Sequence, residues 1–557
     1  MRRARFIVPL AWLVLVLPSL AQDVPEAERA LDEIAGQFFR AADAWDSTGD
    51  GGWCPPREEP GAVLLDARLE EIRRELAEGI DPTVLGDEGW IDYRVLEGMI
   101  EHRLALLELL SGEPSFALPP PEEVEKVLGG EDRESGVDLY ARLACLPGRL
   151  ASVREGLHPP HREAVDAAIL RIDRVRSALA RLGPAAEERL LGEFGARPHD
   201  IRARASLALA VQRARLAGPA AQRAPPKGAG VGRDQFLADL VCYHGIDTPL
   251  EEIVRTAERV LSETERELER TAARIDPTKT WRELTEEAKN AGPPADVVEF
   301  CSKTAREALD FLLAGKFVPV PEFARNLGVA GQDPRRFYPY GFYQPPEGRD
   351  LRGTFVVTTV GDWMTNEERR QKLRDSNPFW LRVVTIHEGL PGHHLQFAFA
   401  ARARTKVRSG YYTPFFSEGW ALYCEELLWR HGFYPDDQTR LAQLRMRAWR
   451  AARVLADVGI HAGTMTPEEA SRLLVERCLL EPVSAEKEVD RYLRSPTQPM
   501  SYLVGWLEIE RLREDYRRMR RDAPGWELEF HTRLLSHGSV PVRLLRAVLL
   551  GERPRMW

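Results

Sequence analysis

The chain has 557 residues, of which 44% are apolar, 29% charged and 8% aromatic. This composition supplies enough apolar material for a large buried core and excludes a disordered protein. Residues 1–21 begin with three arginines, continue with an apolar run and end on small residues before Gln22, an order typical of a cleaved signal peptide. The alternative is an uncleaved N-terminal anchor, although the apolar run is shorter than the about 20 residues that span a bilayer.

The net charge narrows the range of partners. Residues 1–21 hold three of the 77 basic residues and none of the 86 acidic ones, so the rest of the chain has 74 basic residues and a formal charge of −12. A surface this acidic disfavours nucleic acid. No later apolar stretch approaches membrane-spanning length, which excludes transport and channel functions. We therefore expect a periplasmic or secreted protein without membrane contact after removal of the signal peptide.

The cysteines give no metal-binding signature. None of the six is in C-x-x-C spacing: Cys54, Cys145, Cys242, Cys301, Cys424 and Cys478. Export permits disulfides, but buried free thiols suit a chain of this size equally well. No cysteine follows the expected cleavage site, which disfavours a lipid anchor there.

Helical patterns dominate the chain. Residues 25–225 are rich in Leu, Ala, Arg and Glu, with apolar positions three and four apart, which predicts amphipathic helices. The same pattern predicts a long helix over 250–275. A Pro- and Gly-rich loop at 224–228 marks a border near 225–232. The expected organisation is a signal peptide (1–21), an N-terminal helical region (22–230) and a helical catalytic region (231–557), the last two forming one continuous fold.

One segment departs from this helical pattern. Residues 354–360 are rich in β-branched side chains and predict a strand. It belongs either to a small structural sheet or to an exposed edge that pairs with an extended peptide. The expected fold class is mainly α, with a short β-sheet near the active site and the N-terminal helices partly covering that site.

Three histidines and a glutamate lie within eight positions: His387, Glu388, His393 and His394. In the zinc hydrolase motif H-E-x-x-H, two histidines one helical turn apart bind the metal, and the glutamate is a general base for water. A lone histidine beside an apolar segment is more often a hydrogen-bonded core residue, but a cluster of this density favours a metal site.

The spacing of this cluster differs from the usual motif, because position i+4 is Pro391. On an ideal helix, His393 at i+6 is rotated by about 120° from His387, and His394 at i+7 lies about 10.5 Å further along. Neither can share a metal with His387 unless the backbone is deformed. Pro391 and Gly392 permit this, so we expect a two-residue bulge that returns His393 to the second ligand position, with His394 as the alternative.

A third ligand is expected from another helix, and a carboxylate is a common choice. Glu418 follows His393 by 25 residues, a spacing that suits an antiparallel helix pair, and Ser417 is the expected N-cap of the second helix. Alternatively, Glu418 is an acid that complements the helix dipole in the first turn. Glu425 and Glu426 either lie on a solvated helix face or contact one of the metal ligands from outside the site.

Several segments resemble the bacterial domain-of-unknown-function 885 family: 387–396, 417–423, 447–461, 491–505 and 530–541. The resemblance is strong across 335–545 and weak in the first 230 residues. Members of this family resemble gluzincin-type zinc peptidases. The resemblance implies a large helical zinc-peptidase-like fold and zinc as the cofactor, but not the substrate.

The remaining site residues have expected roles in hydrolysis. Tyr502 and His461 are candidate donors to an oxyanion, or else buried hydrogen-bonded side chains. Arg491 and Tyr343 are candidate substrate-binding residues; Arg491 binds a substrate carboxylate or pairs with an acid in the core. Asp457 is a candidate for orienting a ligand histidine.

The expected function is zinc-dependent hydrolysis of short peptides or other amides, with Glu388, Tyr502 and His461 as the catalytic residues. One alternative is a metal-dependent amidase with a non-peptide substrate. Another is a catalytically silent, exported binding protein that keeps the fold.

Overall fold

The computed structural model describes residues 24–46, 65–111, 140, 143, 146, 162–181, 198–217, 230–332, 341–345 and 352–554. The expected signal peptide, the loop at 224–228, Cys54 and Cys145 lie outside these residues. The described part is mainly helical with one three-stranded sheet, which confirms the predicted mainly α class with a short sheet. Among the described helices, none has both the length and the apolar character needed to cross a membrane.

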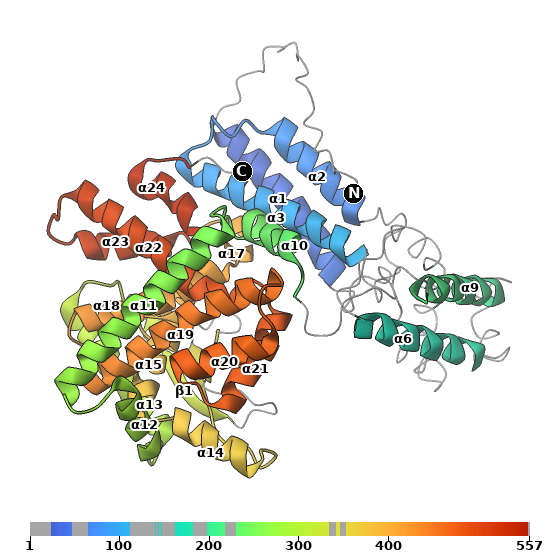
Figure 1. The fold of residues 1–557 in the computed structure, drawn as a ribbon. Coiled ribbons are helices and arrows are strands. Elements are labelled where there is room, and N and C mark those ends of the chain that lie inside the picture. The colour runs from blue at the N-terminus through green and yellow to red at the C-terminus, as the bar shows by residue number, and fades with distance from the viewer. Residues whose placement is uncertain are drawn as a thin grey trace.

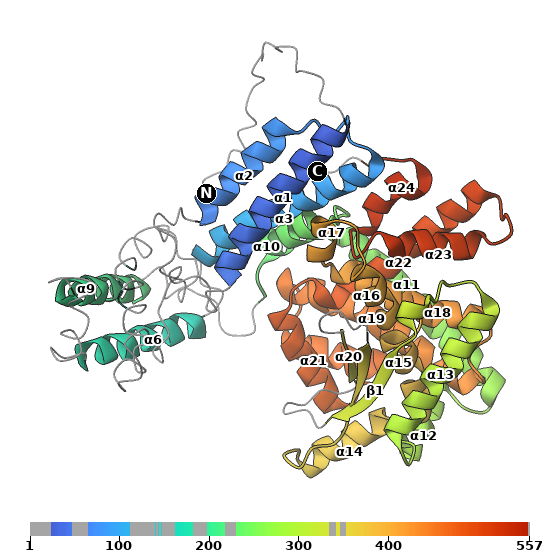
Figure 2. The same ribbon diagram turned by 180° about the vertical axis from the view of Figure 1, so that it is seen from behind.

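The N-terminal helices separate into two groups (Figures 1 and 2). The first comprises α1 (Val24–Asp46), α2 (Leu65–Gly79) and α3 (Asp87–Ser111), and its buried side chains belong to the same hydrophobic core as residues 230–554. The second comprises α6 (Arg162–Arg181) and α9 (Pro198–Leu216), which pack on each other. Their buried residues, such as Ile172 and Leu209, lie outside that core.

The C-terminal region is built around α19 (Asp437–His461), which is buried along almost its whole length. The predicted long helix is confirmed as α11 (Leu250–Ile275), which packs against α19. Other helices around α19 are α12 (Trp281–Ala291), α15 (Pro378–Glu388), α18 (Pro414–Arg430), α20 (Pro467–Cys478), α21 (Pro482–Arg494) and α22 (Gln498–Arg520).

The remaining elements complete this region. They are α10 (Arg233–Ala238), η2 (Asp239–Tyr243), α13 (Val297–Gly315), η3 (Glu322–Ala324), α14 (Asn366–Asp375), α16 (His393–Ala400), α17 (Lys406–Gly410), α23 (Trp526–Ser536), η4 (Val542–Leu545) and α24 (Arg546–Leu550). The four cysteines within the described residues, Cys242, Cys301, Cys424 and Cys478, are free thiols.

The sheet has the strand order β1-β3-β2, with β1 (Leu327–Gln332) parallel and β2 (Gly341–Gln344) antiparallel to β3 (Gly353–Thr358). The predicted strand is therefore confirmed as β3. It is the central strand of a small sheet and is paired on both sides, so the first of the two alternatives, a small structural sheet, is confirmed and the exposed edge is wrong. The sheet packs against α13 through β1 and against α15 through β2 (Figure 2).

Two glycines allow α18 and α22 to cross closely. A Cβ atom on Gly505 would lie 1.8 Å from the carbonyl oxygen of Phe415, and one on Gly419 would lie 2.5 Å from the carbonyl carbon of Gly505. Both distances are far inside van der Waals contact. The crossing brings the first turns of α22 against the part of α18 that carries Glu418.

We expect Gly505→Ala to destabilise the protein by about 1–3 kcal/mol or more, because the added methyl group forces these two helices apart. The matched control is Gly79→Ala at the end of α2, where an added Cβ meets no atom within 4 Å. Differential scanning calorimetry should show a lower melting temperature for Gly505→Ala only. Equal melting temperatures for both variants would contradict the close crossing.

Candidate metal centre

The backbone between the two predicted histidine ligands is interrupted rather than bulged. α15 ends at Glu388, and α16 begins at His393. Between them, the Leu390–Pro391 peptide is cis, and the N–H of Gly392 donates to the carbonyl of Ile386 at 3.2 Å. A Cβ atom at Gly392 would lie 2.0 Å from the carbonyl oxygen of His387, so the turn requires glycine. The expected two-residue bulge is therefore wrong in form, because the chain starts a new helix.

This turn brings His393 to His387, and α18 brings Glu418 to both. One potential ligand atom from each residue lies within 4.8 Å of the other two. Oε2 of Glu418 is 3.4 Å from Nε2 of His387 and 3.2 Å from Nε2 of His393. Ligand atoms about 2.0–2.1 Å from a tetrahedral zinc ion lie about 3.3–3.4 Å apart. The two distances to Glu418 therefore match those of ligands that share one metal ion, and they also suit charged hydrogen bonds.

Each histidine is oriented by a partner on its other ring nitrogen. Nδ1 of His387 lies 2.9 Å from Oε1 of the buried Glu425. Nδ1 of His393 lies 3.2 Å from Oγ of Ser417, which donates to Oε1 of Gln396 at 3.0 Å. The Ser417 hydroxyl is thereby left to accept from Nδ1–H of His393. Each histidine therefore turns its Nε2 atom towards Glu418. Once the imidazole is neutral, that atom would offer a lone pair to a metal, as in sites whose histidines are held by outer hydrogen bonds.

Two expectations for α18 are corrected. Its N-cap is Thr413 rather than Ser417, since the helix begins at Pro414. Glu418 therefore lies beyond the first turn, and the proposed role in complementing the helix dipole does not explain it. Glu425 contacts the candidate ligand His387, whereas Glu426 pairs with arginines of α19.

The charges within the cluster shift its pKa values. Burial by itself raises the pKa of Glu418, but His393 and His387 outweigh it and hold that pKa well below its usual range. Burial lowers the pKa of His387, but hydrogen bonds to Glu418 and Glu425 raise it overall to about 9. For Glu388, burial raises the pKa, which suits a group that takes up and releases a proton.

A cavity of about 50 Å³ lies beside His387 and Glu388. Tyr502, Arg491 and Gly341 also line it, so it joins the predicted base to one predicted oxyanion donor and one predicted substrate-binding residue. Among the described residues, none from α1 to α9 lines this cavity. The expected partial cover by N-terminal helices is therefore not found in that part of the chain.

Tyr502 is positioned by contacts with the cluster. Its ring stacks on His387 with centroids 5.9 Å apart and planes at 13°. Nε2 of Gln498 donates to the Tyr502 hydroxyl at 3.4 Å and to Oε1 of Glu418 at 3.3 Å. Burial raises the pKa of Tyr502, so the hydroxyl keeps its proton. That proton remains available for donation into the cavity.

His394 and Tyr343 lie together, apart from the three-residue cluster. Nδ1 of His394 is 3.0 Å from the hydroxyl oxygen of Tyr343, and the Tyr343 ring stacks on Phe397 at 5.5 Å. His394 is thus not brought to His387. Of the two candidates for the second ligand position, His393 is the one that lies beside His387 and Glu418. Tyr343 does not belong to the described cavity wall.

His461 is held by the backbone on both ring nitrogens. Nδ1 accepts from the N–H of Val231 at 3.1 Å, so Nε2 carries the proton and donates to the carbonyl of Tyr492 at 3.1 Å. Its hydrogen bonds describe a structural histidine rather than the expected oxyanion donor. Asp457 accepts from the N–H of Met500 at 3.1 Å and therefore supports the start of α22 rather than a ligand histidine.

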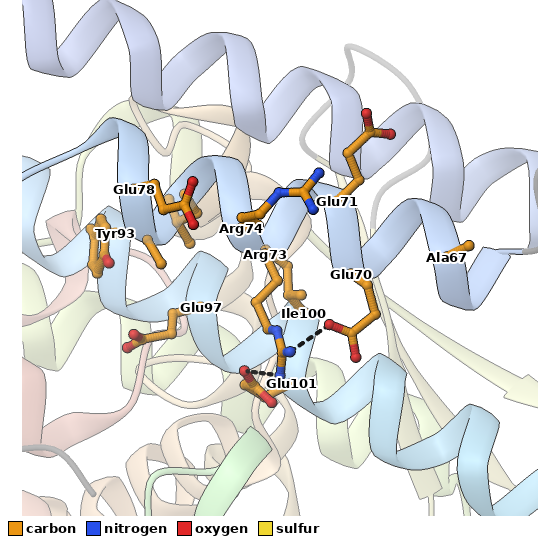
Figure 3. Close-up of a pocket in the computed structure, with 12 residues that line it drawn as sticks. Ala67, Glu70, Glu71, Arg73, Arg74, Glu78, Tyr93, Glu97, Ile100 and Glu101 are labelled. Carbon is orange, nitrogen blue, oxygen red and sulfur yellow. Dashed lines mark ion pairs between the residues drawn. The ribbon is translucent and has the colours of Figure 1, made fainter. Parts of the chain in front are cut away.

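A larger hollow than this cavity lies elsewhere in the described part of the chain. A groove of about 660 Å³ lies between α2 and α3 (Figure 3). Its walls carry acids and arginines, with Arg73 paired to Glu70 at 2.5 Å and to Glu101 at 3.6 Å. These side chains are 37–50% exposed, so the groove is an ordinary charged helix surface.

The fold and the site define a mainly helical protein with a buried cluster of two histidines and a glutamate. The chain belongs to the family described as bacterial proteins of unknown function, DUF885, whose sequence profile matches residues 58–549. This confirms the family resemblance seen in the sequence. A comparison with curated proteins gives no match.

Two solved structures share the fold. One is described as a candidate lipoprotein of unknown function from Shewanella oneidensis; it is 19% identical, has a TM-score of 0.69, and the match covers 95% of this chain and 100% of that one. The other is described as a candidate lipoprotein from Colwellia psychrerythraea, with 17% identity, a TM-score of 0.61 and coverage of 94% and 99%.

Because only His393 faces His387 and Glu418, we expect His393→Ala to abolish metal binding and His394→Ala to preserve it. The measurement is zinc content by elemental mass spectrometry after reconstitution and desalting. About one zinc per chain is expected for the unaltered protein and for His394→Ala. The opposite pattern would mean that His394 is the ligand.

We expect Glu425→Gln to weaken metal binding by about 10–100-fold, since it removes the charge that orients His387. Glu426→Gln is the matched control, because the neighbouring acid pairs with Arg440 and Arg447 instead. Competition with a chelating dye measures both affinities. Similar affinities for the two variants would show that Glu425 does not support the site.

Proposed function

We propose that this chain is an exported zinc-dependent hydrolase that cleaves short peptides, with a fold of the gluzincin peptidase type. The observation that carries the proposal is the convergence of His387, His393 and Glu418 next to Glu388. Two imidazoles and one carboxylate form a three-ligand set of the kind used by catalytic zinc sites, whereas structural sites use four protein ligands.

The residues around the cavity match the steps of amide hydrolysis. When bound, zinc would act as a Lewis acid that activates water and polarises a carbonyl group. Glu388 takes one proton from the attacking water as the new C–O bond forms, and it passes that proton to the amine as the C–N bond breaks. Tyr502 donates a hydrogen bond to the carbonyl oxygen while negative charge develops there.

The size of the cavity favours small substrates. A volume of about 50 Å³ admits part of one residue rather than a folded chain. Gly341 of β2 forms part of the wall, so the sheet restricts the cavity on one side. An exopeptidase or oligopeptidase fits these dimensions better than a proteinase for folded proteins.

Export is supported by the signal-peptide pattern of residues 1–21 and by the description of both structural relatives as candidate lipoproteins. In this chain the residue that follows the expected cleavage site is Gln22 rather than a cysteine. A periplasmic or secreted protein is therefore the form proposed for this chain.

The test is Glu388→Gln in the zinc-loaded protein, assayed by mass spectrometry on a panel of short peptides and acyl amino acids. We expect zinc content to be unchanged and hydrolysis to fall by about 10²–10⁴-fold, because the proton acceptor is lost. Undiminished hydrolysis would show that another residue is the base. Cleavage of acyl amino acids alone would favour an amidase, and zinc binding without any hydrolysis would favour a silent binding protein.

A further inference from the structure

Three arginines from two helices line the cavity beside the candidate metal centre: Arg450 and Arg453 of α19, and Arg491 of α21. We propose that they form a binding site for a substrate carboxylate. The inference rests on the proposed function and narrows it, because it assigns substrates that carry a free carboxylate close to the bond that is cleaved.

The cavity wall has more positive than negative charge. Its two acids are Glu388 and Glu488. Glu488 accepts hydrogen bonds from Nη2 of both Arg453, at 2.9 Å, and Arg491, at 2.8 Å. One carboxylate therefore serves two guanidinium groups. A carboxylate entering the cavity would supply the second negative charge for this pair.

Arg450 is also incompletely neutralised. Its nearest acid is Glu425, with Nη2 of Arg450 3.6 Å from Oε1 of Glu425. That same oxygen lies 2.9 Å from Nδ1 of His387. Glu425 is thus shared between an arginine and a ligand histidine, and the wall keeps an excess of positive charge near the cluster.

Two nitrogens of these arginines have no hydrogen-bond partner in the described part of the chain: Nη1 of Arg453 and Nε of Arg450. Both residues are only 4% exposed, so bulk solvent reaches neither guanidinium group. A buried donor on a charged group that lacks a partner is destabilising, so a ligand that supplies an acceptor is favoured. A carboxylate bound in the cavity would offer up to four lone pairs to the arginines that line it.

The guanidinium groups are held in place. Arg453 donates through Nε to the hydroxyl of Tyr492 at 3.1 Å, and its Cζ atom lies 3.9 Å from the ring centroid of Trp449 and 4.4 Å from that of Tyr502. Arg450 lies over the same two rings at 4.8 and 5.5 Å. Stacked, fixed arginines bind planar carboxylates well.

The available volume selects the size of the ligand. A cavity needs about 10–15 Å³ to hold one water molecule, so about 50 Å³ holds three to five waters or one carboxylate with its adjoining atoms. Glu388 lines the same cavity. The carboxylate therefore lies within about one residue of the bond on which Glu388 acts, either as the C-terminal carboxylate or as an acidic side chain.

The test measures binding, so it does not depend on turnover. Full-length Glu388→Gln, loaded with zinc, is titrated calorimetrically with N-acetyl dipeptides, each as the free acid and as the C-terminal amide. The panel covers small, aromatic, basic and acidic second residues. We expect the free acids to bind at least about tenfold more tightly than their amides. The proposal is overturned if no free acid binds more tightly than its amide. One exception applies: tight binding of the amide whose second residue is glutamate would assign the site to an acidic side chain.

Variants show whether arginines create the preference. We expect Arg450→Gln and Arg491→Gln to remove the preference for free acids. Arg447→Gln is the control that should keep this preference, because Arg447 also lies on α19 but pairs with Glu267 and Glu426. A preference that survives both cavity variants places the carboxylate on the metal and overturns the arginine site. Thermal melting checks folding. Because the Arg491 side chain is 22% exposed, its variant keeps the test decisive if Arg450→Gln does not fold.

The outcome is separable from that for the proposed function. Tight, arginine-dependent binding of free acids, without hydrolysis by the zinc-loaded unaltered protein, would refute the hydrolase and leave the carboxylate site standing. Hydrolysis of acids and amides at equal kcat/KM, with equal binding, would support the hydrolase and refute the carboxylate site.

Discussion

A helix with five buried arginines sets the arrangement of the C-terminal region. These are Arg440, Arg445, Arg447, Arg450 and Arg453 of α19. Because a buried guanidinium without a counter-charge is strongly destabilising, acids from other helices must approach α19. They come from α11, α14, α18 and α21: Glu267, Asp375, Glu425, Glu426 and Glu488. Charge pairing, together with apolar packing, thus fixes where these helices lie.

The same pairing reaches the candidate metal centre through Glu425. This carboxylate contacts Arg450 on one side and His387 on the other. The orientation of His387, a candidate ligand, is therefore tied to the charges of the core. At another member of the cluster, the close crossing of α18 and α22 brings Gln498 to Glu418. The site is supported from two directions by contacts between helices that are distant in sequence.

The sequence allowed prediction of features that local patterns determine. Apolar periodicity predicted α11, β-branched residues predicted β3, and motif spacing predicted His387, His393 and Glu418. Features that depend on pairs distant in sequence were missed. Glu488 meets Arg453 across 35 residues, and His461 meets the backbone at Val231 across 230, and neither pairing leaves a local pattern. Ser417 was misassigned because a serine before an acid resembles an N-cap, whereas Thr413 and Pro414 start the helix.

The break between α15 and α16 has a consequence for how the ligands are held. In a continuous helix, two histidines one turn apart keep their spacing as long as the helix itself persists. Here His387 lies in the last turn of α15 and His393 is the first residue of α16. Their separation therefore depends on how these two helices pack. A compact, partly denatured state that retains its helices but loses side-chain packing would therefore lose the ligand geometry as well, which makes this cluster a reporter of native tertiary structure.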